Sequence, residues 1–136
     1  MMVVRQGVDS FNQGDTKAFS AACADQGAII DSIPPHEWHG SGMCSQWMDA
    51  FNAWIMKNGI TEAHLTAGEA RHIDITGDHA YVVPPMSFTY KDHGKPMKQT
   101  GSLEIFSLAK GNSGWRISGW AWAEGVTAAV SAESGH

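Results

Sequence analysis

Hydrophobic residues recur at helical spacing in the first part of the chain. Val4, Val8 and Phe11 are separated by four and three positions, so they share one face of a predicted helix. Gly14 is expected to end this helix, because glycine readily adopts the backbone conformation found just after helix ends. A second short helix is predicted within residues 15–27, with Asp15 as its N-cap.

The clearest amphipathic stripe follows after a break. Residues 28–30 predict a brief strand, which ends before a pair of prolines at 34–35 because proline cannot donate to a strand ladder. Ser41 can cap a third helix, and residues 58–59 are expected to end it. The apolar residues of this helix repeat at helical spacing: Met43, Trp47, Phe51, Trp54 and Ile55.

The second half of the chain has a strand-like texture. Turn residues separate four segments rich in β-branched and aromatic residues: 61–75, 79–90, 96–109 and 115–123. Short turns imply antiparallel neighbours. The order of elements predicts an α+β fold, in which N-terminal helices pack on the concave face of a curved, mostly antiparallel sheet. We expect one domain over residues 1–125 and a flexible C-terminal tail over 126–136.

Composition and charge narrow the classes of function. The 136 residues are 43% hydrophobic and 17% charged, which is typical of a globular chain with a real core. The net charge of −5 argues against nucleic acid or an anionic membrane surface as a partner. The start of the chain does not resemble a secretory signal, so we expect a cytoplasmic protein. Cys23 and Cys44 are interpreted as buried free thiols, with a disulfide as the less favoured alternative.

The order of motifs resembles the nuclear-transport-factor-2-like superfamily, specifically its SnoaL-like and ketosteroid-isomerase-like branch. The match rests on the exit of the second helix into Ala28-Ile29-Ile30-Asp31, on Trp38-His39-Gly40, on the hairpin at 77–82 and on the stretch 114–122. The resemblance implies a cone-shaped fold around a small-molecule pocket. It also implies a homodimer formed through the open face of the sheet.

The strand pattern is compatible with that homodimer. Over residues 101–108, Leu103 and Ile105 have one parity and Phe106 and Leu108 have the other, as expected for a strand that is buried on both faces. A partner chain could cover one of the faces. The alternative is a sheet that is covered by its own chain.

Three residues are candidates for acid–base catalysis. Asp31 follows a predicted strand, and the resemblance implies that a carboxylate at such a strand end can face the cone and move protons. The alternative is that Asp31 caps its own turn. His36 could carry a proton at the pocket mouth or lie in a surface loop. Glu104 is the partner of Asp31 if its strand parity faces the cone, and otherwise it lies at the dimer face.

Six tryptophans are unusual in so short a chain, and large aromatic side chains line apolar pockets, so we expect an aromatic pocket wall. The alternative for most of the tryptophans is that they fill the core. The candidate substrate-binding residues are Trp38, Trp54, Tyr81, Phe88, Trp120 and Trp122. His36 and His39 are three positions apart in a proline-containing stretch, and the chain has no zinc-binding motif, so we predict no metal. We also predict no cofactor.

These observations leave three functions open, each of a different class. The first is a cofactor-independent proton-transfer enzyme of the isomerase, cyclase or dehydratase type, acting on a small apolar molecule. The second is a non-catalytic small-molecule binder with an aromatic cavity. The third is an accessory dimeric protein whose cone is filled by its own side chains. Sequence leaves open the parity that would place Glu104, Tyr81 and Trp120 inside or outside the cone.

Overall fold

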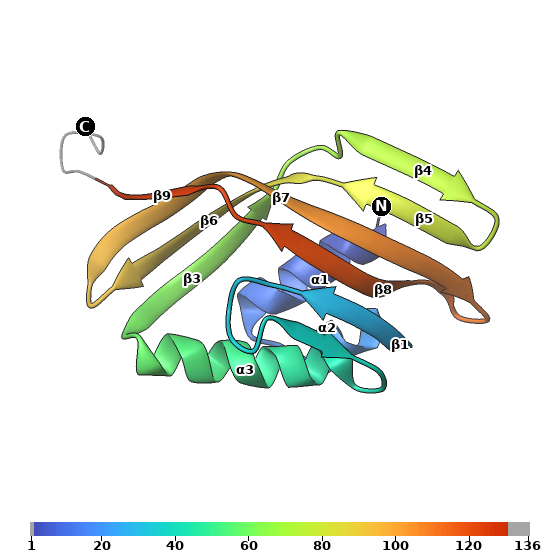
Figure 1. The fold of residues 1–136 in the computed structure, drawn as a ribbon, viewed down its shortest axis with the longest axis horizontal. Helices are drawn as coiled ribbons and strands as arrows, with labels where there is room; N and C mark the ends of the chain where they lie inside the picture. The colour runs from blue at the N-terminus through green and yellow to red at the C-terminus, as the bar shows by residue number, and fades with distance from the viewer. Residues whose placement is uncertain (1, 131–136) are drawn as a thin grey trace.

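The fold is α+β, as predicted. The computed structural model describes residues 2–130, in which three helices lie against one face of a curved sheet that does not close (Figure 1). The helices are α1 (Met2–Gln13), α2 (Thr16–Ala21) and α3 (Met43–Lys57). The strands are β1 (Cys23–Ile30), β2 (Glu37–His39), β3 (Ile60–Ala67), β4 (His72–Thr76), β5 (His79–Val83), β6 (Pro85–Asp92), β7 (Lys95–Gly111), β8 (Gly114–Ala123) and β9 (Val126–Ala129).

Strand β7 organises the sheet. Its 17 residues pair with β6 in their first part and with β5 in their second, while β8 and β9 occupy the other edge. All of these pairs are antiparallel, and the pair between β1 and β8 is parallel. Because one long strand runs through both halves, the sheet can curve over the helices (Figure 1).

The structure decides the strand parity that sequence left open. Glu104, Phe106 and Leu108 on β7 are buried on the concave side, whereas Leu103 and Ile105 alternate with them and are only partly buried. The apolar core fills the space between this concave face and the helices, with large aromatic side chains on both sides. Glu104 is therefore a carboxyl placed among core residues.

The β1 region differs from the prediction. The second helix ends at Ala21, and the strand begins at Cys23 rather than at residue 28. Gly27, which suggested a helix end, instead permits close contact with β8: a Cβ atom there would lie 1.9 Å from the Ser118 carbonyl oxygen. Pairing with β8 and β2 thus prevails over local helical propensity.

Other boundaries also shift. The N-cap of α3 is Gly42 rather than Ser41. The predicted strand over 61–75 is two strands, β3 and β4, and the segment 79–90 is divided at Pro84 into β5 and β6. Residues 126–129, which were predicted to begin a loose tail, form β9 against residues 97–100 of β7. The rest of that predicted tail from residue 131 lies outside the described residues.

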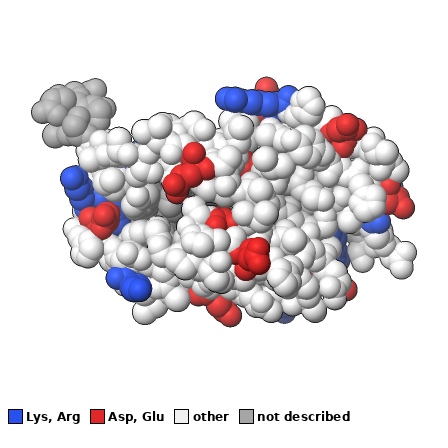
Figure 2. Space-filling model, viewed as in Figure 1, with Lys and Arg blue, Asp and Glu red and all other residues white. Residues whose placement is uncertain are grey.

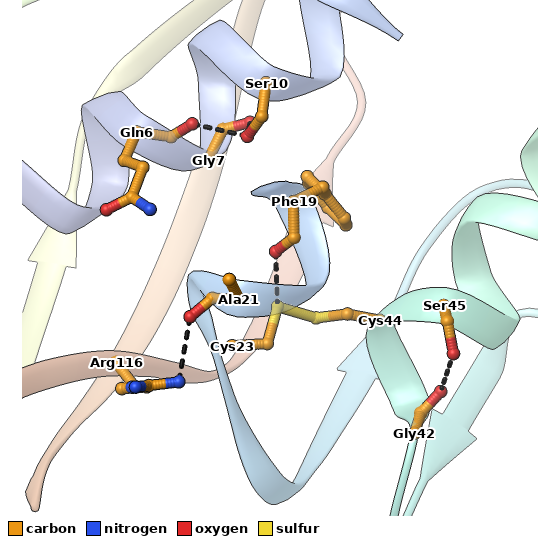
Figure 3. The surroundings of a disulfide bond; sticks show 10 residues. All are labelled: Gln6, Gly7, Ser10, Phe19, Ala21, Cys23, Gly42, Cys44, Ser45 and Arg116. Carbon is orange, nitrogen blue, oxygen red and sulfur yellow. Dashed lines mark hydrogen bonds between the residues drawn. A yellow bond between two sulfur atoms is a disulfide. The ribbon is translucent and has the colours of Figure 1, made fainter. Parts of the chain in front are cut away.

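The prediction of free thiols was wrong. Cys23 and Cys44 form a disulfide that joins the first residue of β1 to the first turn of α3, and both side chains are buried (Figure 3). Beside it, Arg116 on β8 donates to the carbonyl oxygen of Ala21 at 2.9 Å. Disulfides are typical of proteins in oxidising compartments. This bond weighs against the cytoplasmic location expected from sequence, which stays a prediction.

Among residues 2–130, no helix combines the length and the apolar character needed to cross a membrane.

Candidate functional site

A cavity of about 190 Å³ opens between the helices and the concave face of the sheet. In the space-filling view, acidic side chains surround a hollow on the face turned to the viewer, and basic side chains lie toward the edges (Figure 2). Most of the lining is aromatic or polar: Phe11, Asp31, Ser32, Ile33, Trp47, Phe51, Trp54, Leu65, Phe88, Tyr90, Gln99, Glu104, Trp122, Glu124 and Thr127.

Asp31 enters this cavity from the end of β1. A tight loop places it there, since the Asp31 amide donates to the carbonyl oxygen of His36 at 3.0 Å. Its Oδ2 atom accepts hydrogen bonds from the indole Nε1 atoms of Trp47 at 3.0 Å and Trp120 at 3.2 Å. Its Oδ1 atom accepts from the backbone amide of Ser32 at 2.7 Å. Asp31 therefore both caps its own loop and faces the cavity.

Two opposing influences act on the protonation of Asp31. Burial raises the pKa of this carboxyl, because a charge is poorly solvated there. The hydrogen bonds from Trp120, Ser32 and Trp47 act in the other direction, because they stabilise the carboxylate and lower its pKa. Burial is the larger influence, so Asp31 binds a proton more readily than an exposed aspartate, yet three residues donate hydrogen bonds to its charged form.

Glu104 faces the same cavity from β7 and lacks such donors. Its residue is 6% exposed, and its carboxyl makes no hydrogen bond to the side chains or backbone of the described residues. Burial raises the pKa of Glu104 well above its usual value, and the nearby charge of Asp31 raises it further. Glu104 also lines a second, smaller cavity of about 30 Å³. Its carboxyl therefore keeps its proton to a higher pH than an exposed glutamate does.

A polar network supports the wall on the side of β9. The Oε1 atom of Gln99 accepts from Ser102 Oγ at 2.6 Å and from Trp122 Nε1 at 3.1 Å. The Nε2 atom of Gln99 donates to Thr127 Oγ1 at 3.2 Å. Sequence reasoning missed Gln99 and Thr127, because the strand containing Thr127 was assigned to the tail. The network fixes the indole of Trp122 at the cavity.

The predicted wall residues fall into two groups. Trp54, Phe88 and Trp122 line the main cavity, and Trp120 lines the smaller one while donating to Asp31. Trp38 is buried in the core and Tyr81 is 46% exposed on the outer face of β5, and neither lines these two cavities. Phe11, Trp47 and Tyr90 also line the main cavity. Helical spacing had placed Phe11 and Trp47 on apolar helix faces, but none of the three was predicted as a wall residue.

His36 lies apart from the cavity lining. Its side chain is exposed, and its Nδ1 atom is 3.2 Å from the backbone carbonyl oxygen of Asp31. Across residues 2–130, no group of three or more His, Cys, Asp or Glu side chains is arranged to hold a metal ion. A catalytic role for His36 and the absence of a cofactor both stay predictions.

Comparison with known proteins identifies the fold. No family model matches the chain, and no curated protein matches its sequence. A ketosteroid isomerase-like protein from Erwinia carotovora atroseptica superposes with a TM-score of 0.67 at 17% identity, over 96% of this chain and 92% of that one. A nuclear transport factor 2-like superfamily protein from Salmonella enterica gives 0.75 at 19% identity, over 92% and 87%. The chain has the nuclear-transport-factor-2-like fold.

A third neighbour extends the range of activities found on this fold. The hexachlorocyclohexane dehydrochlorinase LinA-type3 from Novosphingobium barchaimii superposes with a TM-score of 0.79 at 5% identity, over 96% of this chain and 86% of that one. At identities this low the likeness concerns the fold alone, because function depends on the residues placed within it. The recognition of the nuclear-transport-factor-2-like fold from sequence is confirmed.

Proposed function

We propose that this protein is a cofactor-independent proton-transfer enzyme of the isomerase, cyclase or dehydratase type, acting on a small, largely apolar molecule. The observation that carries the proposal is that Asp31 and Glu104 share one aromatic-lined cavity but differ in their hydrogen bonding. Pairs of titratable groups whose surroundings separate their pKa values are typical of acid–base sites. Neighbours with the same fold include proteins named for ketosteroid isomerisation and dehydrochlorination.

The geometry suits a division of roles. The Asp31 carboxylate would take a proton from a carbon atom of the bound molecule, and the Trp47 and Trp120 indoles would hold it in position. The protonated Glu104 would donate a hydrogen bond, or its proton, to the substrate atom on which negative charge develops. Return of the proton from Asp31 to another atom of the substrate would complete an isomerisation.

Exchange of carbon-bound hydrogen with solvent tests this role of Asp31. We would incubate the protein with a panel of small cyclic ketones in deuterium oxide and follow deuterium incorporation by NMR. Asp31→Asn should slow exchange by about 10²–10⁴-fold, the usual contribution of a general base. Asp25→Asn removes an exposed carboxylate on β1, the strand that leads to Asp31; it is the matched control and should leave the rate unchanged. Equal exchange rates in Asp31→Asn and wild type would refute the role of Asp31.

A non-catalytic binder is the second candidate, favoured by the aromatic lining itself. In that case a ligand would bind without exchange, Trp54→Ala would weaken its binding, and Asp31→Asn would have little effect on affinity. Ligand titrations of Trp54→Ala and Asp31→Asn, run beside the exchange assay, therefore distinguish the binder from the enzyme.

We further propose that the protein forms a homodimer through the outer face of the sheet. Ile30 is 60% exposed there, and it pairs in register with Ala121, which in turn pairs with the partly buried Ile105 of β7. An apolar face of this kind is typical of protein interfaces. Light scattering should give twice the mass of one chain, and Ile105→Lys should give a single chain. A wild-type mass of one chain would contradict the proposal.

A further inference from the structure

The charges that line the main cavity all have one sign. Asp31, Glu104 and Glu124 contribute carboxyls, and no Lys, Arg or His is among the described residues of the lining. The ion pairs of residues 2–130 that the structure contains, Lys91 with Glu62 and His93 with Asp92, involve none of these carboxyls. The acidic cavity therefore lacks a counter-charge from the described part of the chain.

Glu104 gives a second, independent indication. Buried carboxyl groups nearly always have hydrogen-bond partners, because an unpaired polar atom loses its interaction with water. Glu104 is 6% exposed, and its carboxyl lines the cavity and forms no hydrogen bond with residues 2–130. The Glu104 oxygen atoms keep contact with the open space of the cavity, so a donor on that side comes from what occupies the cavity, either water or a bound molecule. The carboxylates of Asp31 and Glu124 on this lining would repel an anionic ligand.

The remaining walls favour a cation over a neutral donor. Aromatic faces attract organic cations through the negative charge of their π systems, tryptophan and tyrosine most strongly, and Trp54, Tyr90 and Trp122 all line this space. The cavity volume of about 190 Å³ exceeds the roughly 150 Å³ of an engineered cavity that holds benzene. One ring with a small charged group would fit.

We propose that the main cavity binds a small organic cation, an amine or quaternary ammonium on an apolar body, with its charge directed at Glu104 and Asp31. The proposal rests on the proposed function in one respect, namely that this cavity is a small-molecule site. It adds the charge class of the ligand. A cation would supply both the missing counter-charge and, in the case of an amine, the missing donor.

Binding of a permanent cation should depend on pH through Glu104. The titratable groups that face Glu104 across the cavity are Asp31 after β1, Glu124 after β8 and Tyr90 on β6. Helices α1 and α3 contribute apolar and aromatic side chains to the lining. A cation stabilises the ionised form of Glu104, so its binding releases a proton and should strengthen as pH rises.

Three probes of similar size test the proposal by calorimetric titration: benzyltrimethylammonium, benzyl alcohol and phenylacetate. At about pH 8 we expect the cation to bind about 10-fold more tightly than the alcohol, a difference that an aromatic and acidic site can supply, and phenylacetate not to bind. Lowering the pH to about 5 should weaken binding of the cation and leave binding of the alcohol unchanged, because only cation binding depends on the ionisation of Glu104.

Variants test whether Glu104 is the residue responsible for cation binding and its pH dependence. Glu104→Gln should reduce cation affinity about 10-fold and remove its pH dependence, while the alcohol binds as before. Glu69→Gln, which removes an exposed carboxylate outside this lining, is the matched control and should behave as wild type. The pH series on the unmodified protein gives the same test without any substitution.

The outcomes separate this proposal from the proposed function. If benzyl alcohol binds as tightly as the cation at both pH values, the charge class is refuted and the small-molecule cavity stands. If none of the three probes binds, this proposal fails together with its premise. The deuterium-exchange assay on ketones remains a separate measure of proton transfer.

Discussion

The two sides of one cavity differ in the hydrogen bonds that they offer to a carboxyl group. On the β1 side, the Asp31 carboxylate accepts four hydrogen bonds, two from the indoles of Trp47 and Trp120 and two from the amide and hydroxyl of Ser32. On the β7 side, Glu104 is more deeply buried, and its carboxyl makes no hydrogen bond to residues 2–130. Folding thus satisfies one carboxylate and leaves the other without a partner. A stable fold alone would favour an apolar residue at position 104, so the comparison points to function at the β7 side.

The Asp31 side is also held covalently. The disulfide joins β1 to α3, the two elements that supply Asp31 and its donor Trp47. Replacing both cysteines by alanine should lower the free energy of unfolding by about 3 kcal/mol, the loop-entropy value for a sequence separation of 21. Urea unfolding of the double variant against oxidised wild type measures this. An unchanged midpoint would show that the bond contributes nothing.

Removing the carboxyl of Asp31 should be the next largest effect. Asp31→Ala leaves the indole donors of Trp47 and Trp120 without their acceptor, and we expect a loss of about 2 kcal/mol after allowance for the relief of a buried charge. Asp25→Ala, the exposed counterpart on β1, should change stability far less. Urea unfolding at neutral pH compares the two variants. Equal losses would show that the hydrogen bonds of Asp31 stabilise nothing.

A single donor can then be removed. Trp120→Phe deletes one hydrogen bond to the carboxylate and should cost about 1.5 kcal/mol, in the range for bonds to charged groups. The pKa of Asp31 should also rise further, because that bond lowers it in the wild type. Carbon-detected NMR titration of the Asp31 carboxyl measures the shift. A fall in this pKa would contradict the account.

The β9 side offers a neutral bond for comparison. Trp122→Phe removes the hydrogen bond to Gln99, and we expect a loss of about 1 kcal/mol, because neither partner is charged. The ratio of the two Trp→Phe effects, read from unfolding curves in one buffer, therefore reports how strongly Asp31 is ionised. A larger loss for Trp122→Phe than for Trp120→Phe would overturn that interpretation.

Much of the fold could be predicted because helical spacing and turn residues carry strong local signals. The helix containing Trp47 and the strands β7 and β8 follow directly from those patterns. Residues 23–27 of β1 and the disulfide could not be predicted, because Gly27 and Cys23 owe their positions to contacts with β8 and α3. Distant pairing of this kind leaves no local periodicity.

The candidate site was predictable in part for a similar reason. Asp31 and Glu104 are conspicuous as charged residues beside apolar runs, and the structure brings both to one cavity. Trp38 and Tyr81 were chosen for residue type alone, and the parity and curvature of the sheet place them elsewhere. Gln99 and Thr127 gain their places only when β9 pairs with β7.

The central claim is that Glu104 is buried without a partner for its charge, and the pH dependence of stability tests it most directly. Below the usual glutamate pKa the residue is neutral in both the folded and the unfolded chain. As pH rises, the unfolded chain ionises first, so the wild type should lose stability relative to Glu104→Gln.

Urea unfolding of both proteins from about pH 4 to about pH 8 gives the result. The account predicts that the two are similar in stability at the acidic end and that Glu104→Gln becomes progressively more stable toward the basic end. A wild type that gains stability over Glu104→Gln as pH rises would mean that Glu104 has a charge partner, and the account would be wrong.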